Sequence, residues 1–185
     1  MKKSHENLLK AIAGESMARN KYTYYAEIAM KEGFVWIARV SEETADNERA
    51  HAQEELEKLS EKTEMTNTYN IHPLGTTLEN LRNAAAGEEY EFGTMYPGFE
   101  KIARDEGENE IATLFKEISE VEEKHAERYT ILADKLEQGK LFESEQEIEW
   151  KCLNCGYIHK GKSAPKNCPL CKKPQGYYMA LRIVR

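Results

Sequence analysis

The chain has 185 residues, of which 32% are charged, and its formal net charge is -7 at pH 7. It contains no apolar run of the roughly 18 residues that a membrane-spanning helix needs, and no signal-like apolar segment follows Met1. We therefore expect a cytoplasmic protein with no role in a membrane. Residues 149–185 hold eight Lys or Arg and one acid, which leaves a balance of -14 for residues 1–148. An acidic main body argues against nucleic acid as its partner.

Four segments place apolar or small residues at helical spacing. The expected helices cover about residues 4–31, 34–61, 76–105 and 108–137. Gly33 separates the first two helices, and the last one stops near Gly139. Pro97 lies inside the third helix, where it should kink or loosen the preceding turn because proline has no N–H donor.

The connection between the second and third helices decides the topology. Residues 63–75 are polar and include Pro73. Thirteen extended residues reach at most about 43 Å, and a helix of 28 residues is about 42 Å long, so this loop can run back along the bundle. The second and third helices would then be parallel. This long crossover is typical of ferritin-like four-helix bundles, and an all-α bundle of that kind is the expected fold of residues 1–139.

An internal repeat relates the two halves of the expected bundle. Glu48 and His51 recur as Glu122 and His125 after a shift of 74 residues, and the segment 11–15 resembles the segment 84–88 after a shift of 73. Two half-sites related by an approximate two-fold axis are therefore expected. Glu91 breaks the symmetry, because its counterpart in the first half is Ala18.

The repeated acids and histidines fall where the apolar stripe demands core residues. A glutamate and a histidine three residues apart lie on one helix face, so both can reach the same metal ion. Carboxylates with imidazoles suit a pair of iron or manganese ions. The competing interpretation is that glutamates are simply common on charged helices and that one Glu-x-x-His is a weak signal. Acids from all four helices favour metal, and the expected ligands are Glu15, Glu48, His51, Glu88, Glu91, Glu122 and His125.

All four cysteines lie in the last part of the chain. Cys152 and Cys155 form one C-x-x-C pair, and Cys168 and Cys171 form a second pair twelve residues later. This spacing predicts one tetrahedral four-thiolate site, although spacing alone does not separate a zinc ribbon from a single redox iron. We expect residues 140–148 to be a charged linker and residues 149–185 to be a small β/loop domain whose fold is stabilised by its bound metal.

The order of the motifs GES, ERAH, GEEYE, MYPGF and EVEEKH, followed by WKCLNCGY and NCPLC, resembles the rubrerythrin family over essentially the whole chain. The resemblance implies a rubredoxin-like C-terminal domain with an Fe(SCys)4 centre. It also implies a non-haem, carboxylate-bridged di-iron site in the bundle. The implied activity is that of a peroxidase that reduces hydrogen peroxide to water and protects against oxidative stress.

The resemblance also implies individual roles. Glu48 and Glu122 would bridge the irons, Glu88 and His125 would hold one iron, and Glu15 would hold the other. That second iron would exchange Glu91 for His51 on reduction. Tyr22 and Tyr96 match family tyrosines near the site, and the residues alone leave open whether they only pack there or donate hydrogen bonds. The candidates for a direct part in catalysis are thus Glu91, His51, Tyr22 and Tyr96.

The implied partners are hydrogen peroxide and an external electron donor, either a rubredoxin or an NAD(P)H-dependent reductase. The resemblance also implies a homodimer or a higher head-to-tail oligomer, in which the tail of one subunit lies near the bundle of another. Two other functions remain open at this point. One is a ferroxidase or iron-storage protein on the same bundle, and the other is a zinc-ribbon interaction module on a helical scaffold.

Overall fold

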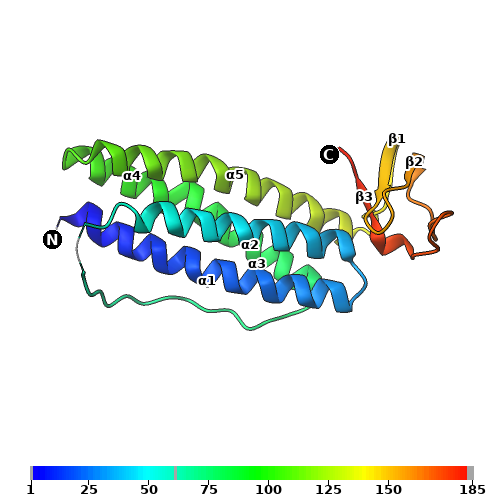
Figure 1. The fold of residues 1–185 in the computed structure, drawn as a ribbon, viewed down its shortest axis with the longest axis horizontal. Coiled ribbons are helices and arrows are strands. Elements are labelled where there is room, and N and C mark those ends of the chain that lie inside the picture. The colour runs from blue at the N-terminus through cyan, green and yellow to red at the C-terminus, as the bar shows by residue number, and fades with distance from the viewer. Residues whose placement is uncertain (1, 61, 183–185) are drawn as a thin grey trace.

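The computed structural model describes residues 2–60 and 62–182. Residue 61, the expected end of the second helix, and residues 183–185, at the end of the expected tail domain, lie outside this part. The helices are α1 (Lys3–Lys31), α2 (Val35–Leu56), α3 (Thr77–Tyr90), α4 (Tyr96–Asp105) and α5 (Asn109–Glu137). They form one elongated four-helix bundle in which α3 and α4 together make up one side (Figure 1). Among the described residues, no helix is long and apolar enough to cross a membrane.

The ends of the helices follow local sequence signals. Gly33, Gly107 and Gly139 all adopt positive φ, at +87°, +77° and +67°, where a side chain would be strained. α3 begins with a capping box, in which the Thr76 hydroxyl accepts from the Glu79 N–H and the Glu79 carboxylate accepts from the Thr76 N–H. These signals explain why the expected bounds of the first and last helices agree closely with the structure.

The second helix is shorter than expected. It ends at Leu56, and this side chain is 52% exposed although its place in the apolar stripe of the segment predicts a buried position. α1 runs antiparallel to α2 and begins at Lys3, so the α2 axis has little helix surface to pack on beyond this point (Figure 1). Leu59 leaves the helix and still packs, partly buried, against the apolar cluster at this end of the bundle.

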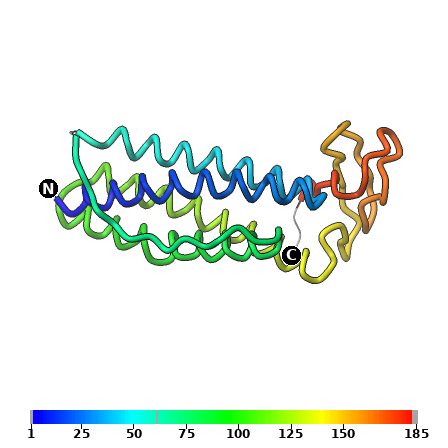
Figure 2. Tube along the Cα trace, turned by 90° about the horizontal axis from the view of Figure 1, so that it is seen from below, coloured from blue at the N-terminus to red at the C-terminus, as the bar shows by residue number. Residues whose placement is uncertain are grey.

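The long crossover is confirmed. The chain after α2 runs along the outside of the bundle from one end to the other before α3 begins (Figure 2). Tyr69 connects this crossover segment to α1, because its hydroxyl donates a hydrogen bond to the backbone carbonyl of Lys10 at 3.5 Å. The second and third helices of the bundle are therefore parallel, and all four helices can present side chains to one interior.

The third helix is interrupted rather than continuous. A π-helix, η1, occupies Glu91–Met95 between α3 and α4, and the Tyr96 N–H donates to the carbonyl of Glu91, five residues back. Pro97 has no N–H for the carbonyl four residues earlier, which explains why the wider turn forms just before it. The expected loosening is confirmed. The extra residue in the turn brings Tyr96 to a fully buried position.

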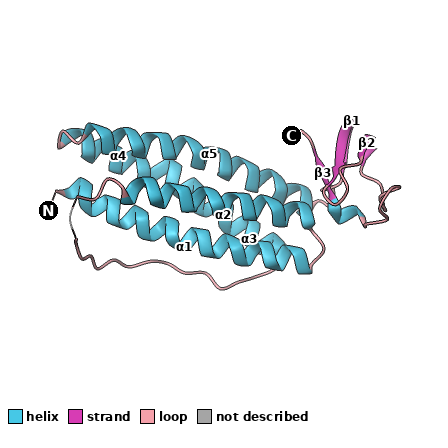
Figure 3. Ribbon diagram, in the orientation of Figure 1, coloured by secondary structure: helices cyan, strands magenta, loops and turns pink. Residues whose placement is uncertain are grey.

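The C-terminal domain is a small sheet at one end of the bundle (Figure 3). Its strands are β1 (Glu143–Cys152), β2 (Ile158–Ser163) and β3 (Tyr178–Ala180), with the antiparallel order β2-β1-β3 and the short 3-10 helix η2 (Gln175–Tyr177) before β3. The prediction that residues 140–148 form a linker is wrong for residues 143–148, because they form the first part of β1. Glu143 pairs with Ser163, and the register shifts before Ile148 pairs with Gly161.

The tail packs tightly on the end of its own bundle. Trp36 of α2 and Leu132 of α5 share one buried cluster with Trp150 and Tyr178 of the sheet. Gly176 approaches so closely that a Cβ added there would lie 1.8 Å from the carbonyl oxygen of Gly33. Only glycine fits this contact.

Gly176→Ala is therefore expected to loosen the tail and lower the thermal midpoint of the metal-loaded protein. Overpacking of this kind costs about 1–3 kcal/mol, and each 1 kcal/mol shifts the midpoint by roughly 2–4 °C in a chain of this size. Gly98→Ala is the matched control, because a Cβ there meets nothing within 4 Å. Calorimetry of both variants tests the contact, and equal midpoints would contradict it.

Candidate metal centres

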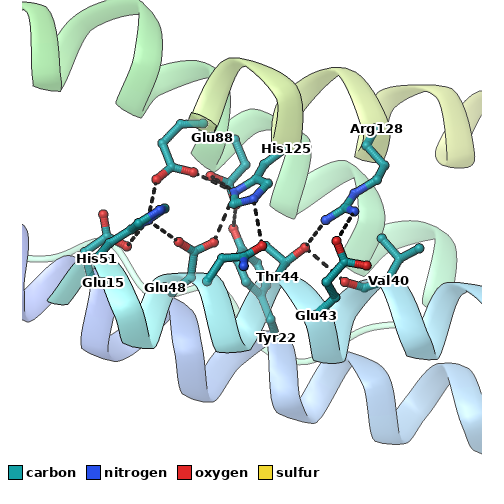
Figure 4. Close-up of polar contacts among 12 residues, drawn as sticks. Glu15, Tyr22, Val40, Glu43, Thr44, Glu48, His51, Glu88, His125 and Arg128 are labelled. Carbon is teal, nitrogen blue, oxygen red and sulfur yellow. Dashed lines mark hydrogen bonds and ion pairs between the residues drawn. The ribbon is translucent and has the colours of Figure 1, made fainter. Parts of the chain in front are cut away.

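Acids and histidines from all four sides of the bundle meet in its interior (Figure 4). They form two groups, each with ligand atoms within 4.8 Å of one another: Glu15, Glu48, His51 and Glu122 in the first, and Glu48, Glu88, Glu122 and His125 in the second. Glu48 and Glu122 belong to both groups. The arrangement therefore offers two adjacent metal positions that share two carboxylates.

Each histidine faces the shared acids in a similar way. The His51 Nδ1 atom lies 2.8 Å from Glu122 Oε1, 3.0 Å from Glu48 Oε2 and 3.8 Å from Glu15 Oε2. The His125 Nδ1 atom lies 2.7 Å from Glu122 Oε2, 3.4 Å from Glu48 Oε1 and 4.0 Å from Glu88 Oε2. The two-fold relation expected from the sequence repeat therefore appears in the contacts of the side chains.

Many ligand atoms in this interior form no hydrogen bond, although the histidine rings lie close to several of them. The four glutamates of the two groups are at most 1% exposed. Within the described residues, five of their carboxylate oxygens are buried without a hydrogen-bond partner: Glu15 Oε2, Glu48 Oε1, Glu48 Oε2, Glu88 Oε2 and Glu122 Oε1. Buried acceptors without donors are costly, and cations would satisfy them. The hard oxygen ligands with imidazole fit iron or manganese.

In the metal-free chain, protons compensate part of this charge. Burial raises the pKa of Glu15 and of Glu88 well above the usual value for a carboxyl group. Burial would lower the pKa of His125, but its contacts with Glu122 and Glu48 outweigh this and raise it to about 9. Burial would raise the pKa of Glu122, yet the two histidines lower it to about 2. Metal ions would replace these protons.

Both tyrosines donate hydrogen bonds to acids of the site. The Tyr22 hydroxyl donates to Glu88, and the Tyr96 hydroxyl donates to Glu15. Each of these acids belongs to only one of the two groups, so the tyrosines hold the outer carboxylates on opposite sides. Hydrogen bonding, and not packing alone, thus describes the geometry of Tyr22 and Tyr96.

Glu91 is the expected ligand that the structure does not bring into either group. It begins the π-helix and is partly exposed. Burial and the negative charges of Glu122 and Glu48 nevertheless raise its pKa to about 7. It therefore lies beside the centre without joining it in this conformation.

The sequence did not indicate several residues that support the centre. Asn47 lies next to Glu48, and its Oδ1 atom is 3.3 Å from His125 Nε2, so it fixes the ring from the side away from the acids. Arg128 donates to Thr44 at 2.7 Å and to Glu43 at 2.9 Å, beside the site in Figure 4. Glu55, one helical turn after His51, is fully buried. Its spacing from His51 is the one signal that could have identified it.

The four cysteines form a second, separate site. Cys152 Sγ lies 3.7 Å from Cys171 Sγ, and Cys155 Sγ lies 3.6 Å from Cys168 Sγ, too far for disulfides. A tetrahedron with metal–sulfur bonds of about 2.3 Å has edges of about 3.8 Å, so these spacings fit one metal ion. Burial would raise the pKa of Cys168, but the Cys171 N–H and the Tyr178 hydroxyl lower it to about 6. The thiolate that a metal requires is thus favoured.

The shared position of Glu48 gives a prediction about metal content. Glu48→Ala is expected to lose both bundle metals, because this acid belongs to both groups, whereas Glu15→Ala is expected to retain one of them. Glu89→Ala, an exposed neighbour of Glu88, is the control and should keep both. Elemental analysis after anaerobic loading with ferrous iron measures the difference. Equal losses in Glu48→Ala and Glu15→Ala would contradict the shared geometry.

Comparisons with known proteins agree with these two sites. The sequence model of the family described as Rubrerythrin matches residues 6–138, and that described as "Rubrerythrin, rubredoxin-like domain" matches residues 150–179. Rubrerythrin-1 of Clostridium acetobutylicum is 46% identical over 97% of this chain and 94% of its own length. Rubrerythrin of Porphyromonas gingivalis is 44% identical over 97% of this chain and 90% of its own.

Solved structures support the same conclusion. The fully reduced, all-ferrous state of nigerythrin superposes with a TM-score of 0.67 at 33% identity, covering 97% of this chain and 87% of that one. Bacterioferritin of Rhodobacter capsulatus, at 19% identity and a TM-score of 0.67 over 75% of this chain and 89% of its own, shares the fold of the bundle. The sites of this chain fit a carboxylate-bridged di-iron centre and one iron bound by four cysteines. The chain belongs to the rubrerythrin family and has its C-terminal rubredoxin-like domain.

Proposed function

We propose that this protein is a non-haem di-iron peroxidase that reduces hydrogen peroxide to water in the cytoplasm and so protects the cell against oxidative stress. The observation that carries this proposal is the pair of adjacent metal positions that share Glu48 and Glu122 inside the bundle. A site with two metals can deliver two electrons together, which is the number that reduction of one peroxide molecule consumes.

When bound, the two ferrous ions supply the two electrons that break the O–O bond, and two protons complete the conversion of one peroxide into two waters. The chain's own residues hold the centre. Glu48 and Glu122 keep the two positions adjacent, while Tyr22 and Tyr96 orient the outer acids Glu88 and Glu15. Burial of these acids excludes bulk water and strengthens every charge interaction among them.

Glu91 and His51, the residues that make the site asymmetric, are the ligands that we propose to exchange when the centre is reduced. His51 Nδ1 already faces the acids of the first group, whereas Glu91 lies beside the centre on the π-helix. Glu91 would hold the metal of the first group in the oxidised protein, and His51 would hold it in the reduced protein. A π-helix suits such an exchange, because single wide turns of this kind are frequent at functional sites.

The four cysteines would hold one iron, and this iron would supply a relay for single electrons from an external donor, a rubredoxin or an NAD(P)H-dependent reductase. A homodimer or larger head-to-tail oligomer would bring the tail of one subunit near the bundle of another. The basic tail and acidic bundle are charge-complementary, which supports such docking. Association of this kind should weaken as salt increases.

A ferroxidase and a peroxidase differ in the oxidant that they prefer, which is dioxygen for the first and hydrogen peroxide for the second. Stopped-flow oxidation of the reduced protein by hydrogen peroxide and by dioxygen, at equal concentrations, tests the proposal. We expect peroxide to react faster and one equivalent to oxidise both bundle irons. Preference for dioxygen, with accumulation of ferric iron in a shell, would support iron storage instead. A colourless protein with zinc in the tail would support the interaction module.

A further inference from the structure

Lys21 places a positive charge at the edge of the acidic metal centre. It lies on α1 and is partly buried, and its Nζ atom lies over the ring of Tyr22, 4.8 Å from the ring centroid. This distance is that of a cation–π contact. Tyr22 in turn donates a hydrogen bond to Glu88, which belongs to the second ligand group. The ammonium group of Lys21 is therefore separated from the metal ligands by a single side chain.

The same ammonium group lies against the surface of α3. A Cβ atom added at Gly87 would be 3.7 Å from Lys21 Nζ. Glu91 is one turn further along this helix, and residues four apart on a helix have Cβ atoms about 5–6 Å from each other. Glu91 still has helical dihedral angles, φ -64° and ψ -54°, so its side chain leans back toward residues 87 and 88. The Glu91 carboxylate can therefore reach Lys21.

Glu91 thus has two partners on the preceding turn of its helix. Glu88, three residues earlier, belongs to the metal centre, whereas Gly87, four residues earlier, faces Lys21. A rotation of the Glu91 side chain moves its carboxylate from the first position toward the second. Among the described residues, Lys21 has no ion pair within 4.0 Å, so its charge is available to a carboxylate that leaves the centre.

A carboxylate that leaves the metals needs a positive charge elsewhere, because an uncompensated charge in a partly buried site is costly. Burial and the negative charges of Glu122 and Glu48 raise the pKa of Glu91, whereas the positive charge of Lys21 acts in the opposite direction. The electrostatic effect of Lys21 on Glu91 therefore agrees with the position of its ammonium group beside α3.

The sequence repeat also links these two residues. Glu91 has no acidic counterpart in the first half of the bundle, where the matching residue is Ala18. Lys21 likewise has no cationic counterpart in the second half, where the positions 73 and 74 residues later are Thr94 and Met95. The acid that breaks the symmetry of the ligands therefore occurs together with a cation that breaks it too.

We propose that Lys21 is a positioning residue that receives the Glu91 carboxylate in an ion pair when Glu91 leaves the metal of the first group. The inference rests on the proposed function, in which His51 replaces Glu91 on reduction. The carboxylate moves from one positive charge to another, and neither Lys21 nor Glu91 gains or loses a proton. Lys21 thereby stabilises the outer position of Glu91, and with it the reduced centre.

Crystal structures of the iron-loaded protein in its oxidised and reduced states test the ion pair. We expect the Glu91 carboxylate to lie within about 4 Å of Lys21 Nζ in the reduced protein and further away in the oxidised protein. If Glu91 leaves the metal on reduction but does not approach Lys21, the role of Lys21 is wrong and the ligand exchange stands. If Glu91 keeps the same place in both states, the exchange itself is wrong and the inference fails with it.

Redox titration of the bundle irons, followed by Mössbauer spectroscopy, measures the effect of the charge. In Lys21→Met, which keeps the length of the side chain, we expect the ratio of reduced to oxidised centre at a fixed potential to fall about threefold, as for loss of a partly exposed ion pair. Lys21→Arg keeps the charge and should keep the ratio. Lys31→Met, at an exposed position of the same helix, should match the unaltered protein.

Combining Lys21→Met with Glu91→Gln separates the ion pair from a general effect of charge on the irons. Glu91→Gln removes the charge that the ion pair needs, so Lys21→Met should change the ratio little in this background. An equal fall with and without the Glu91 carboxylate would mean that Lys21 acts directly on the irons, and this result would overturn the proposal. An unchanged ratio in Lys21→Met alone would overturn it as well.

Discussion

Cys168→Ala is expected to stop turnover supported by the external electron donor while a single oxidation of the reduced bundle by peroxide remains. Cys168 is one of four thiolates around one metal position, and its sulfur lies 3.6 Å from that of Cys155. Without it the tail iron, which we propose as the electron relay, is lost, although both metal positions in the bundle keep all their ligands. The loss should exceed the roughly 10–100-fold that removal of an outer hydrogen-bond partner of a metal ligand costs.

The same result could arise if the tail simply unfolds without its metal, since metal binding and folding are coupled in small domains. Replacing the tail iron by zinc in the otherwise unaltered protein separates the two causes. Zinc has no redox chemistry but keeps the tetrahedral site closed, so the tail stays folded. We expect the zinc form to lose donor-supported turnover as completely as Cys168→Ala. Normal turnover in the zinc form would show that electrons reach the bundle by another route.

Removal of the bundle metals is expected to lower the thermal midpoint by roughly 10 °C or more. A ligand present at a thousandfold excess over its Kd stabilises the folded state by about 4 kcal/mol, and each 1 kcal/mol shifts the midpoint by roughly 2–4 °C. In this protein the metal also relieves the cost of burying the five carboxylate oxygens of Glu15, Glu48, Glu88 and Glu122 that lack a hydrogen bond. Calorimetry of metal-free and iron-loaded protein measures the difference.

The pH dependence of the metal-free protein provides a sharper test. The pKa of Glu91 is raised from 4.5 to about 7 and that of His125 from 6.5 to about 9. Both groups bind protons more tightly in the folded chain than in the unfolded one. Their contribution to stability is therefore present at low pH and is lost as pH rises, from about 4.5 to 7 for Glu91 and from about 6.5 to 9 for His125.

Glu122 has the opposite sign, because its pKa is lowered to about 2. Its contribution is complete above about 4.5 and is lost only as pH falls toward about 2, so it does not reverse the trend near neutral pH. Metal affinity rises with pH because protons compete with the metal for the same ligands. The gap between the midpoints of loaded and metal-free protein should therefore widen from about pH 5 to 8. A constant or narrowing gap would contradict the account.

The parts of the site that follow helical periodicity were predictable from the sequence. Glu48 and His51, and Glu122 and His125, lie on continuous α-helix, where residues three apart share a face whatever the tertiary structure. The long crossover was predictable from a different property, because the segment between the second and third helices is long enough to run back along the bundle. The four-cysteine site was predictable from the spacing of its two C-x-x-C pairs alone.

Glu55 and Glu91 show where periodicity fails. From hydrophobicity alone, the sequence predicts that Leu56 is buried and that the neighbouring Glu55 is exposed. Glu55 is buried instead, and its contact with Tyr96 involves a residue of another helix, which helical periodicity in α2 does not reveal. At Glu91 the π-helix adds a residue to the turn, so the phase of α3 does not extend to α4. Residues 143–147 are polar, and only the pairing of Glu143 with Ser163 and of Ile148 with Gly161 shows that this segment is part of β1.

Mössbauer spectroscopy of the oxidised, fully loaded protein tests the central claim most directly, because it distinguishes paired from isolated ferric ions. The shared acids Glu48 and Glu122 hold the two bundle positions adjacent. We therefore predict that the bundle irons appear as one spin-coupled pair with a diamagnetic ground state, beside a separate signal from the four-cysteine iron. Isolated paramagnetic ferric ions in the bundle, or iron in the tail alone, would contradict the account.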